Sequence, residues 1–596
     1  MHRHHDMPFG VSLTTSGAVF RLWAPAAAEI GLRLSTQGRE RAMMRNAEGW
    51  FEATVDGARP GDLYQFVIDG KQAVPDPASR FQPADVNGPS EIVDPSAFGW
   101  SDGAWTGRPW HEAVVYELHL GDFSRGGSFA TAQQQLERLA RLGVTAIELM
   151  PVADFAGQRN WGYDGVLPFA PDSAYGRPED LKALICEAHR LGLMVLIDVV
   201  YNHFGPEGNY LPLYAPQFFS QGTTAWGQAI NFGGIARRFF IHNALYWLEE
   251  YHADGLRFDA VHAIEDESTP HFLAELAEEV RRTVGSPNIH LILENDKNEA
   301  RYLERGASGA PLSYDAQWND DFHHAMHVAL TGESDGYYGD YAADPIASLG
   351  RALTQGFVYQ GELSPFRGAA RGEPSGHLPP LAFVNFIQNH DQIGNRAFGE
   401  RLIALTSREA LRAAIAILLL APSPPLLFMG EELGAGEPFL FFCDFRGPLG
   451  DAVRQGRWRE FAHFPAFASE EAREAIPDPL ALETFERSRI DRSLAAPDPD
   501  FAELYADLLA LRHREIVPRL AGLRDASAGY ETRGRWLGAH WRLADGSRLA
   551  LCANLSDAAV AAPLAAEGRL LWECCPSEGP LAPWAVRWTL ADGDTP

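Results

Sequence analysis

The central part of the chain alternates short apolar runs with longer amphipathic segments. Eight runs have the length and turn boundaries of buried strands, and they begin at Ala113, Ala146, Met194, Gly255, His290, Leu312, Ala382 and Pro424. Between several of them lie predicted helices, such as 130–143 and 177–192, the second of which begins with Pro178 and ends on Gly192. Eight parallel strands joined by crossover helices predict an α/β fold, a (β/α)8 TIM barrel.

The two ends of the chain have a different pattern. Up to about residue 105, short alternating runs such as AVFRLWAP and GDLYQFVIDG are separated by Gly, Pro and Asp turns, which predicts a small β-sandwich. The last stretch, with RWLGAHWRLA and AVRWTLA, alternates again after a helix that reaches about Leu520. We therefore expect an N-terminal β-sandwich module over 1–105, the barrel over 106–500, and a C-terminal helix and β-domain over 501–596.

The length of the chain agrees with this organisation, and its net charge restricts the class of partner. A chain of 596 residues, 46% of them apolar, is too long for one ordinary core and suits a barrel with appended domains. The 50 basic and 79 acidic residues give a net charge of −29. This charge argues against nucleic acid or an anionic membrane as a partner, and it is compatible with a neutral ligand.

Cysteines and apolar runs indicate the compartment. The chain has five cysteines without metal-like spacing, which predicts buried reduced thiols: Cys186, Cys443, Cys552, Cys574 and Cys575. The start, MHRHHDMPFG, lacks an apolar signal core, and the longest apolar run, 413–421, is far shorter than the roughly 20 residues of a membrane span. We therefore expect a cytoplasmic protein, with histidines 2, 4 and 5 in a frayed, solvated terminus.

The run ADGLRFDAVHAI places Arg257 and Asp259 inside a predicted strand. Side chains alternate along a strand, so the two charges point to one face and Leu256 and Phe258 to the other. A buried carboxylate needs a partner, and the nearby guanidinium favours the ionised form of Asp259. For this strand alone, a structural ion pair in the core is an equally good explanation.

Other predicted strands carry polar residues at the same end. The third strand is followed by Asp198, Asn202 and His203, the fifth by Glu294, and the seventh by residues 389–391, Asn-His-Asp. Each of these alone could be a turn or a solvated strand end. Because active sites of TIM barrels lie at the carboxyl ends of the strands, the whole set predicts a functional site rather than packing.

Paired carboxylates are what cleavage of a glycosidic bond needs, one ionised and one protonated. Asp259, beside Arg257, is predicted to be the ionised carboxylate. Glu294 follows the apolar run LIL with no cation beside it in sequence, and desolvation raises the pKa of a carboxyl, so it is predicted to be the acid. Asp391 would hold sugar hydroxyls and favour an oxocarbenium-like transition state.

The segments DVVYNH, GLRFDAVH, the E of LILEND and FIQNHD resemble, in this order, four short conserved regions of the α-amylase superfamily of glycoside hydrolases. The resemblance implies that Asp259 is the nucleophile, Glu294 the general acid and base, and Asp391 the transition-state stabiliser. It also implies a set of substrate-binding residues: Tyr163, His203, Arg257, His262, Asn389, His390 and Gln392.

Longer segments indicate which family within this superfamily the chain resembles. YDAQWNDDFHHAMHVALTGESDGYYGDY, GFVYQGELSPFRG and NHDQIGNRAFGERL resemble the maltooligosyltrehalose trehalohydrolase family, and the sandwich resembles a starch-binding-type module. This implies a retaining hydrolase that cleaves the α-1,4-glucosidic bond next to the terminal trehalose unit of maltooligosyltrehalose and releases trehalose, a step of trehalose biosynthesis. The implied partners are a malto-oligosaccharide substrate and, functionally, maltooligosyltrehalose synthase.

Two alternatives share parts of this pattern. A glycogen branching or debranching enzyme would have the same sandwich, barrel and acids, and it stays open at this point. A non-catalytic glucan-binding relative should have lost at least one acid, whereas Asp259, Glu294 and Asp391 are all present.

From the segment after the third strand we expect no bound metal. We expect no other cofactor either. Only a short insertion, about 203–235, stands where many amylases place a calcium-stabilised domain, and it has no obvious cluster of oxygen ligands. Asn202 matches a calcium-binding residue of some relatives, but we expect it to be a hydrogen-bonding scaffold residue. Trp161, Trp226 and Trp318 are candidate sugar platforms, for which ordinary packing is an equally good explanation.

Overall fold

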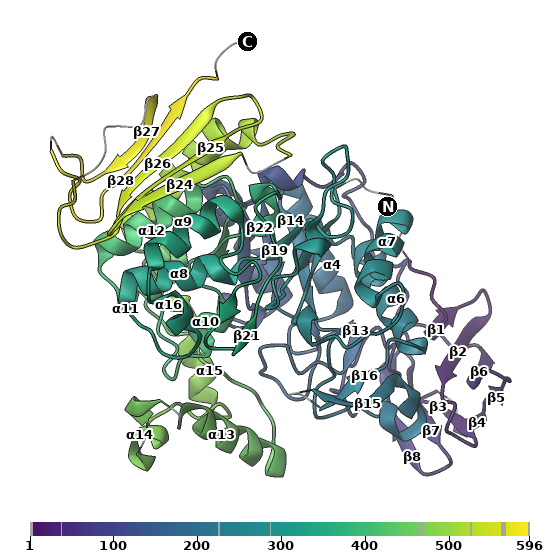
Figure 1. The fold of residues 1–596 in the computed structure, drawn as a ribbon. Coiled ribbons are helices and arrows are strands. Elements are labelled where there is room, and N and C mark those ends of the chain that lie inside the picture. The colour runs from purple at the N-terminus through teal and green to yellow at the C-terminus, as the bar shows by residue number, and fades with distance from the viewer. Residues whose placement is uncertain are drawn as a thin grey trace.

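The computed structural model shows a central barrel with a β-domain on either side (Figure 1). The structure describes residues 4–593 apart from 37, 225–226, 286–287, 463, 468, 525–526, 562–567 and 578. The N-terminal domain, in purple, and the C-terminal sheet, in yellow, lie at opposite ends of the molecule.

The eight predicted strands form one parallel sheet. They are β10 Val115–Leu118, β11 Ala146–Leu149, β14 Met194–Val199, β17 Gly255–Phe258, β18 His290–Leu293, β19 Ala316–Trp318, β22 Phe383–Val384 and β23 Leu426–Phe428. Spatial neighbours follow chain order, and the first strand, β10, also pairs with the last, β23. A parallel bridge between Asn385 and Pro425 completes the ring. The predicted TIM barrel is confirmed.

Each barrel strand has two apolar faces. Val115, Ala146 and Leu196 belong to a cluster inside the barrel, together with residues such as Ile292, Ala316 and Leu426. Their sequence neighbours, such as Tyr116 and Ile147, belong to the main core, which lies between the strands and the helices. Because both faces are buried, a charged side chain on these strands must find its partners within the protein.

Crossover helices surround the barrel: α2 Phe129–Gln133, α3 Leu136–Leu142, α4 Pro178–Arg190, α6 Ile235–Glu250, α7 Phe272–Thr283, α8 Asp320–Thr331, α9 Pro345–Gln355, α12 Arg408–Leu420 and α17 Pro499–Leu511. The single helix predicted over 130–143 is wrong, because the chain breaks at Gln134 and Gln135 into α2 and α3. Between β18 and β19 the fully described connection 294–315 contains a 3-10 turn, Ala300–Leu303, and no α-helix.

Further helices lie in the loops: α1 Leu120–Phe123, α5 Leu211–Tyr214, α10 His390–Gly394, α11 Leu402–Leu405, α13 Gly447–Phe461, α14 Glu470–Glu474, α15 Leu482–Ser488 and α16 Asp491–Ala495. In the described part of the chain, every helix is too short or too polar to cross a membrane. The apolar run predicted from 413 to 421 lies almost entirely in α12.

The N-terminal domain is the predicted sandwich of two antiparallel sheets. One sheet has the order β1-β2-β6-β5 and the other β4-β3-β7-β8, with β9 added beside β7. The strands are β1 Gly10–Leu13, β2 Gly17–Trp23, β3 Ile30–Leu34, β4 Arg41–Ala42, β5 Met44–Arg45, β6 Trp50–Asp56, β7 Leu63–Ile68, β8 Gln72–Val74 and β9 Ser90–Glu91. In β6, Phe51, Ala53 and Val55 are buried while the residues between them are exposed, which is the period of two that predicted the strand.

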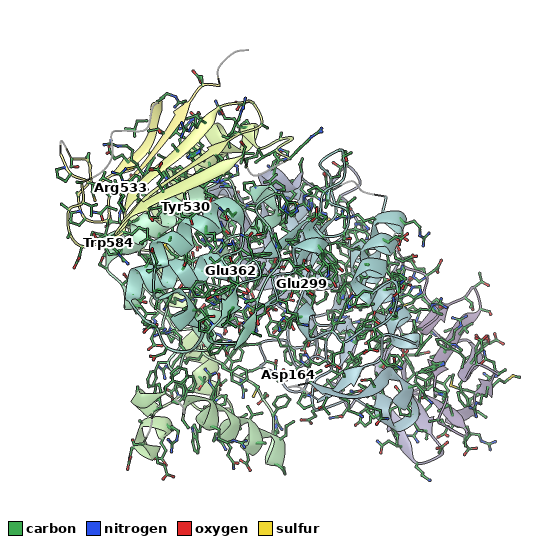
Figure 2. The ribbon with its side chains drawn as sticks, in the orientation of Figure 1. Asp164, Glu299, Glu362, Tyr530, Arg533 and Trp584 are labelled. Carbon is green, nitrogen blue, oxygen red and sulfur yellow. The ribbon has the colours of Figure 1, made fainter. Side chains whose placement is uncertain are left out.

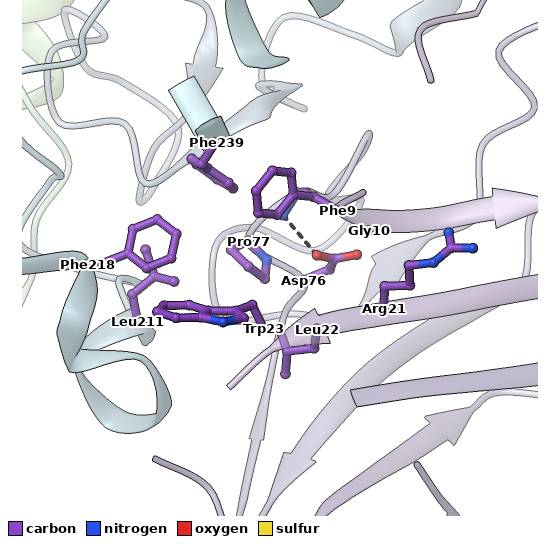
Figure 3. A pocket seen from close by; sticks show the side chains of 11 residues that line it. Phe9, Gly10, Arg21, Leu22, Trp23, Asp76, Pro77, Leu211, Phe218 and Phe239 are labelled. Atoms are coloured by element: carbon purple, nitrogen blue, oxygen red, sulfur yellow. Dashed lines mark hydrogen bonds between the residues drawn. The ribbon is translucent and has the colours of Figure 1, made fainter. Parts of the chain in front are cut away.

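Aromatic side chains fill the joint between the sandwich and the barrel. Phe9 and Trp23 of the sandwich meet Phe218 and Phe239 of the barrel around a small cavity (Figure 3). The space left is about 10 Å³, close to the least that one water molecule needs. The joint is therefore a packed extension of the core.

A buried ion pair crosses the same joint. Arg80, between β8 and β9, donates from Nε to Oε1 and from Nη2 to Oε2 of Glu250 at the end of α6, both at 3.1 Å. His5 is also buried here, with Nδ1 at 2.7 Å from Glu249 Oε2 and its backbone N–H on Glu250. The expectation of a frayed terminus is thus wrong for His5, because the start of the chain packs on α6; His2 lies outside the described residues.

The C-terminal sheet has the order β24-β25-β26-β28-β27 and packs on α9. Its strands are β24 Ala528–Arg533, β25 Trp536–Arg542, β26 Arg548–Asn554, β27 Arg569–Cys574 and β28 Val586–Ala591. Tyr530 of β24 (Figure 2) lies against Gly350 of α9, where an added Cβ would meet its ring at 2.3 Å. The preceding helix α17 packs on α3 and α12 of the barrel, so the predicted boundary at 500/501, which stays a prediction, falls within this helix.

All five cysteines are free, as expected, but the prediction that they are buried is largely wrong. Only Cys443 is fully buried, and Cys575 is exposed. Cys574 ends β27, and Cys575 follows with a φ of 52°, which turns its side chain out of the alternating pattern of the strand.

The Arg80–Glu250 pair generates a stability prediction. Arg80→Met leaves a buried carboxylate without its cation, which should cost about 3–5 kcal/mol and lower Tm clearly. Arg21→Met removes the exposed pair with Glu52 in the same domain and should cost less than about 1 kcal/mol. Thermal unfolding followed by circular dichroism measures both. Equal Tm shifts would contradict the prediction, and adding Glu250→Leu to Arg80→Met should restore most of the loss.

Candidate active site

One buried guanidinium gathers three carboxylates at the mouth of the barrel. Arg257 of β17 is 2% exposed. Its Nη1 lies 2.6 Å from Asp198 Oδ2 and 3.1 Å from Asp259 Oδ1, and its Nη2 lies 3.1 Å from Glu294 Oε2. The guanidinium carbon also lies 4.1 Å from the centre of the Trp318 ring. Three successive strands therefore deliver their acids to one cation.

The register of the sheet explains this convergence. Asp198 pairs with Arg257 across β14 and β17, and Phe258 pairs with Leu293 across β17 and β18. The residues that follow this last pair, Asp259 and Glu294, therefore leave adjacent strands side by side. Their backbone N–H groups continue the ladder, Asp259 to Val199 O at 3.1 Å and Glu294 to Phe258 O at 3.0 Å.

Both oxygens of Asp259 accept a hydrogen bond. Arg257 donates to Oδ1, and the Asn202 amide donates to Oδ2 at 2.8 Å and to the Asp259 carbonyl at 2.9 Å. Asn202 Oδ1 lies 2.5 Å from His203 Nδ1, and His203 Nε2 lies 2.9 Å from the carbonyl of Tyr163. Asn202 thus has protein partners on both ends of its amide. In the ranges that the structure describes, no group of three or more His, Cys, Asp or Glu side chains could hold a metal ion.

Glu294 has the environment of an acid that keeps its proton. Burial raises its pKa well above the usual range, and this effect outweighs the guanidinium of Arg257, which lowers it; the negative charges of Asp259 and Asp391 raise it further. Glu294 has no cation beside it in sequence, but Arg257 reaches it in space from the neighbouring strand. Its Oε2 accepts from Arg257 and from the Ala260 N–H at 2.7 Å, which leaves Oε1 to carry the proton.

The N–H of Ala260 reaches Glu294 because its backbone is left-handed. Ala260 has φ 40° and ψ 48°, a conformation that costs a residue with a Cβ about 1 kcal/mol. The chain turns sharply here from β17 into the 3-10 turn Val261–Ala263. This turn fixes the backbone directly after Asp259 against the carboxyl of Glu294.

Asp391 lies at the start of the short helix α10. Asn389 caps this helix, because its side chain accepts the N–H of Asp391 at 2.9 Å and that of Gln392 at 3.3 Å. The Asn395 amide donates to Asp391 Oδ1 at 2.6 Å, and the side chain of Asp391 is exposed. Its charge contributes to the raised pKa of Glu294, so the two groups lie within electrostatic range.

His390 is held in place by Glu117, an acid that was not among the residues predicted from the sequence. Glu117 of β10 contacts His390 Nδ1 at 2.5 Å and accepts its backbone N–H at 3.1 Å. Burial alone would lower the pKa of His390, but the charge of Glu117, its hydrogen bond to the imidazole and the charge of Asp391 together outweigh burial, and the pKa is raised. The imidazole stacks on Tyr163, centroid to centroid 5.0 Å, and Tyr163 donates to Asp198 Oδ2 at 2.7 Å. An acid within the run VVYEL was the signal available for Glu117.

The two remaining predicted residues make hydrogen bonds to segments that follow other barrel strands. Gln392 Nε2 donates to Asp320 Oδ1 at 3.3 Å. His262, whose pKa is lowered by burial, accepts the N–H of Asp296 through Nδ1 at 3.3 Å. Among the described residues, the hydrogen bonds of these two side chains do not reach the carboxyl pair.

The candidate aromatic platforms are packed rather than open. Trp161 is 5% exposed and stacks on Phe439 with centroids 5.2 Å apart. Trp318 is 2% exposed and lies under Arg257. Both therefore support the site from behind, and Trp226 lies outside the described residues.

Comparison with protein families identifies three parts of the chain. Residues 80–213 match the alpha amylase catalytic domain, and residues 8–95 match carbohydrate-binding module 48, the isoamylase N-terminal domain. Residues 525–588 match a domain of unknown function. The matches coincide with the first part of the barrel, the sandwich and the C-terminal sheet.

Curated relatives match along most of the chain. A malto-oligosyltrehalose trehalohydrolase of Saccharolobus solfataricus is 43% identical over 76% of this chain and 80% of its own length. The proteins of the same name from Deinococcus radiodurans and Mycobacterium tuberculosis are 42% and 39% identical, over 88% and 93% of this chain and 85% and 95% of their own lengths.

Solved structures share the fold. A crystal structure from Salmonella typhimurium that is assigned to the alpha amylases has 46% identity and a TM-score of 0.94, and the match covers 98% of this chain and 99% of that one. A pullulanase of Paenibacillus barengoltzii, with 20% identity, a TM-score of 0.73 and coverage of 99% and 96%, shares the fold alone. On the identity to its curated relatives, the chain belongs to the malto-oligosyltrehalose trehalohydrolase family of α-amylase-type glycoside hydrolases.

Proposed function

We propose that this glycoside hydrolase cleaves the α-1,4-glucosidic bond next to the terminal trehalose unit of maltooligosyltrehalose and releases trehalose, with retention of configuration. The observation that carries the mechanism is the guanidinium of Arg257, which lies 3.1 Å from a carboxyl oxygen of Asp259 and 3.1 Å from one of Glu294 and so holds the two acids side by side. The names of the relatives support the substrate.

In the first step, Asp259 attacks the anomeric carbon of the sugar while Glu294 gives its proton to the leaving oxygen. The bond from the anomeric carbon to that oxygen breaks, and trehalose leaves with the proton. Asp391, exposed at the start of α10, is placed to hold sugar hydroxyls as positive charge develops on the ring. For a retaining reaction the two carboxyl groups should lie about 5 to 5.5 Å apart.

The second step depends on a change in the pKa of Glu294. In the glycosyl ester Asp259 is no longer charged, so one of the charges that raise the pKa of Glu294 is gone. Glu294, having given up its proton, is then ionised and accepts a proton from the water that attacks the ester. The sugar leaves with the configuration it had in the substrate, and both acids return to their starting states.

The segments that resemble trehalohydrolases lie beside the site and support the proposed leaving group. The hairpin of β20 Leu363–Ser364 and β21 Ala369–Ala370 is tied by Arg367 to Asp296, just after β18. Asp340 accepts from the Ser364 hydroxyl and from the Phe366 N–H at 2.8 Å. The Phe366 side chain, 54% exposed, is thus presented on a hairpin held at both ends, and a sugar ring could stack on it.

A glycogen branching or debranching enzyme is the alternative from the same superfamily. Branching makes no new reducing ends, and debranching attacks α-1,6 bonds. The curated relatives that are 39–43% identical along most of the chain carry the trehalohydrolase name instead, which favours the trehalose-releasing reaction.

The proposed setting is the cytoplasm and trehalose biosynthesis. Five free cysteines, one of them exposed, suit a reducing compartment. A malto-oligosaccharide with a trehalose end must be supplied by another enzyme, so we propose that this hydrolase is functionally paired with maltooligosyltrehalose synthase.

The roles of the two carboxyls can be tested by isosteric amides. Asp259→Asn and Glu294→Gln should each lower kcat by about 1,000-fold or more with the fold intact, because each removes a covalent or a proton-transfer step. Asp391→Asn should have a smaller effect, since hydrogen bonding to the sugar survives in part. Trehalose release is measured by chromatography and folding by circular dichroism. Activity within tenfold of the wild type in either of the first two variants would contradict the roles assigned to Asp259 and Glu294.

The pH profile tests the link between Arg257 and Glu294. Glu294 must be protonated to act, so activity is lost as pH rises through its pKa, and the guanidinium lowers that pKa. Arg257→Met should therefore move the alkaline limb of kcat/KM to higher pH, besides lowering kcat. Arg257→Lys keeps the charge and is the matched control. Its alkaline limb of kcat/KM should stay near the pH at which it lies in the wild type. A limb that does not move in Arg257→Met would contradict the electrostatic role.

The stereochemical and substrate proposals can be tested in one NMR time course on maltooligosyltrehalose. Trehalose has no reducing end, so the new reducing end should appear on the malto-oligosaccharide, first as the α-anomer. Plain malto-oligosaccharide of the same length is the control substrate and should be cleaved more slowly. An initial β-anomer would overturn Asp259 as nucleophile, and equal rates on both substrates would overturn the proposed specificity.

A further inference from the structure

A layer of charged residues lies inside the barrel just beneath the carboxyl pair. Glu117, Glu148 and Asp198 stand two positions beyond Val115, Ala146 and Leu196, which line the apolar interior. With Arg257 they are 1%, 2%, 3% and 2% exposed. Glu117 and Glu148 are direct neighbours in the register of β10 and β11, so two carboxyls face the interior side by side.

Glu148 differs from Glu117 in having a carboxyl oxygen without a hydrogen-bond partner in the described part of the chain. Both oxygens of Glu117 contact His390, and Asp198 Oδ2 accepts from Arg257 and Tyr163. Glu148 Oε1 is buried with no hydrogen-bond partner among the described residues. On the adjoining strand β14, Asp198 Oδ1 is likewise a buried oxygen without a donor in the described part of the chain.

The charge balance of the layer decides the state of Glu148. Arg257 and His390 supply two positive charges, and the carboxylates of Glu117, Asp198 and Asp259 already oppose them. An ionised Glu148 would add another negative charge beside Glu117 without a cation of its own. Burial, and next the charge of Glu117, raise the pKa of Glu148 well above its usual range. A buried carboxyl in this position is more stable with its proton.

We propose that Glu148 is a positioning residue, held as a neutral carboxylic acid whose O–H donates to one carboxylate oxygen of this layer. It thereby keeps Arg257 and His390 in place beneath Asp259 and Glu294. The expected effect on kcat rests on the proposed function. The protonation state of Glu148 does not depend on it, because that state is a property of the free enzyme. No covalent step is involved, and the proton stays on Glu148 throughout the reaction.

The same substitution at two neighbouring positions tests the proposal. Glutamine resembles a neutral carboxylic acid in shape and can donate an N–H, so Glu148→Gln should keep kcat within about threefold and keep the pH profile. Glu117→Gln is the matched control, because it removes a carboxylate that faces an imidazolium; kcat should fall about tenfold or more and the pH profile should change. Comparable losses in both variants would overturn the proposal.

Removing the donor separates positioning from a merely structural role. Glu148→Leu should lower kcat about tenfold with little change in KM, and Glu148→Gln should restore the rate. A rate equally low in both variants would contradict a donor role. If Glu148→Leu does not fold, the comparison of the two glutamine variants still decides.

Infrared spectroscopy tests the protonation state without substrate. The difference spectrum of wild type minus Glu148→Gln at neutral pH should show the carbonyl stretch of one protonated carboxylic acid. Carboxylate bands in its place would overturn the proposal. A wild-type enzyme that released no trehalose would refute the proposed function but would leave this measurement valid, so the two failures can be told apart.

Discussion

The barrel mouth depends on one buried cation. Taking the guanidinium of Arg257 out of water costs several kcal/mol, and only well-placed carboxylates can offset this cost. The carboxylates of Asp198 and Asp259 do so, the carboxyl of Glu294 accepts a further hydrogen bond, and the ring of Trp318 covers one face of the guanidinium. Because each acid comes from a different strand, the cluster also fixes those strands relative to one another at the edge where the sheet ends.

The two carboxyls that share Arg257 have different environments. Asp259 receives a donor on each oxygen, from Arg257 and Asn202, which suits a charged group. Glu294 receives both of its donors on one oxygen, and burial raises its pKa. The difference arises from the turn at Ala260, which directs a backbone N–H to Glu294. One shared cation can therefore serve a nucleophile and an acid at the same time.

Much of the fold could be predicted from the sequence, because buried parallel strands have a strong pattern. All eight barrel strands and the sandwich follow from apolar runs and turn residues, and Arg257 and Asp259 were conspicuous as charges within such a run. The contact of Arg257 with Glu294 could not be predicted, because it depends on the register between two strands distant in sequence. Glu117 was missed, although an acid within VVYEL is the same signal as Arg257. The placement of His5 depends on a surface of α6 that no local pattern describes.

The backbone conformation at Ala260 limits which residues can replace alanine at this position during evolution. A φ of 40° excludes β-branched and bulky side chains, and it favours glycine or asparagine. Glycine would relieve the strain, but it would also loosen the turn that directs the N–H to Glu294. Alanine is the smallest residue that still restricts this backbone, so position 260 can drift to few other residues even though its side chain has no part in the chemistry.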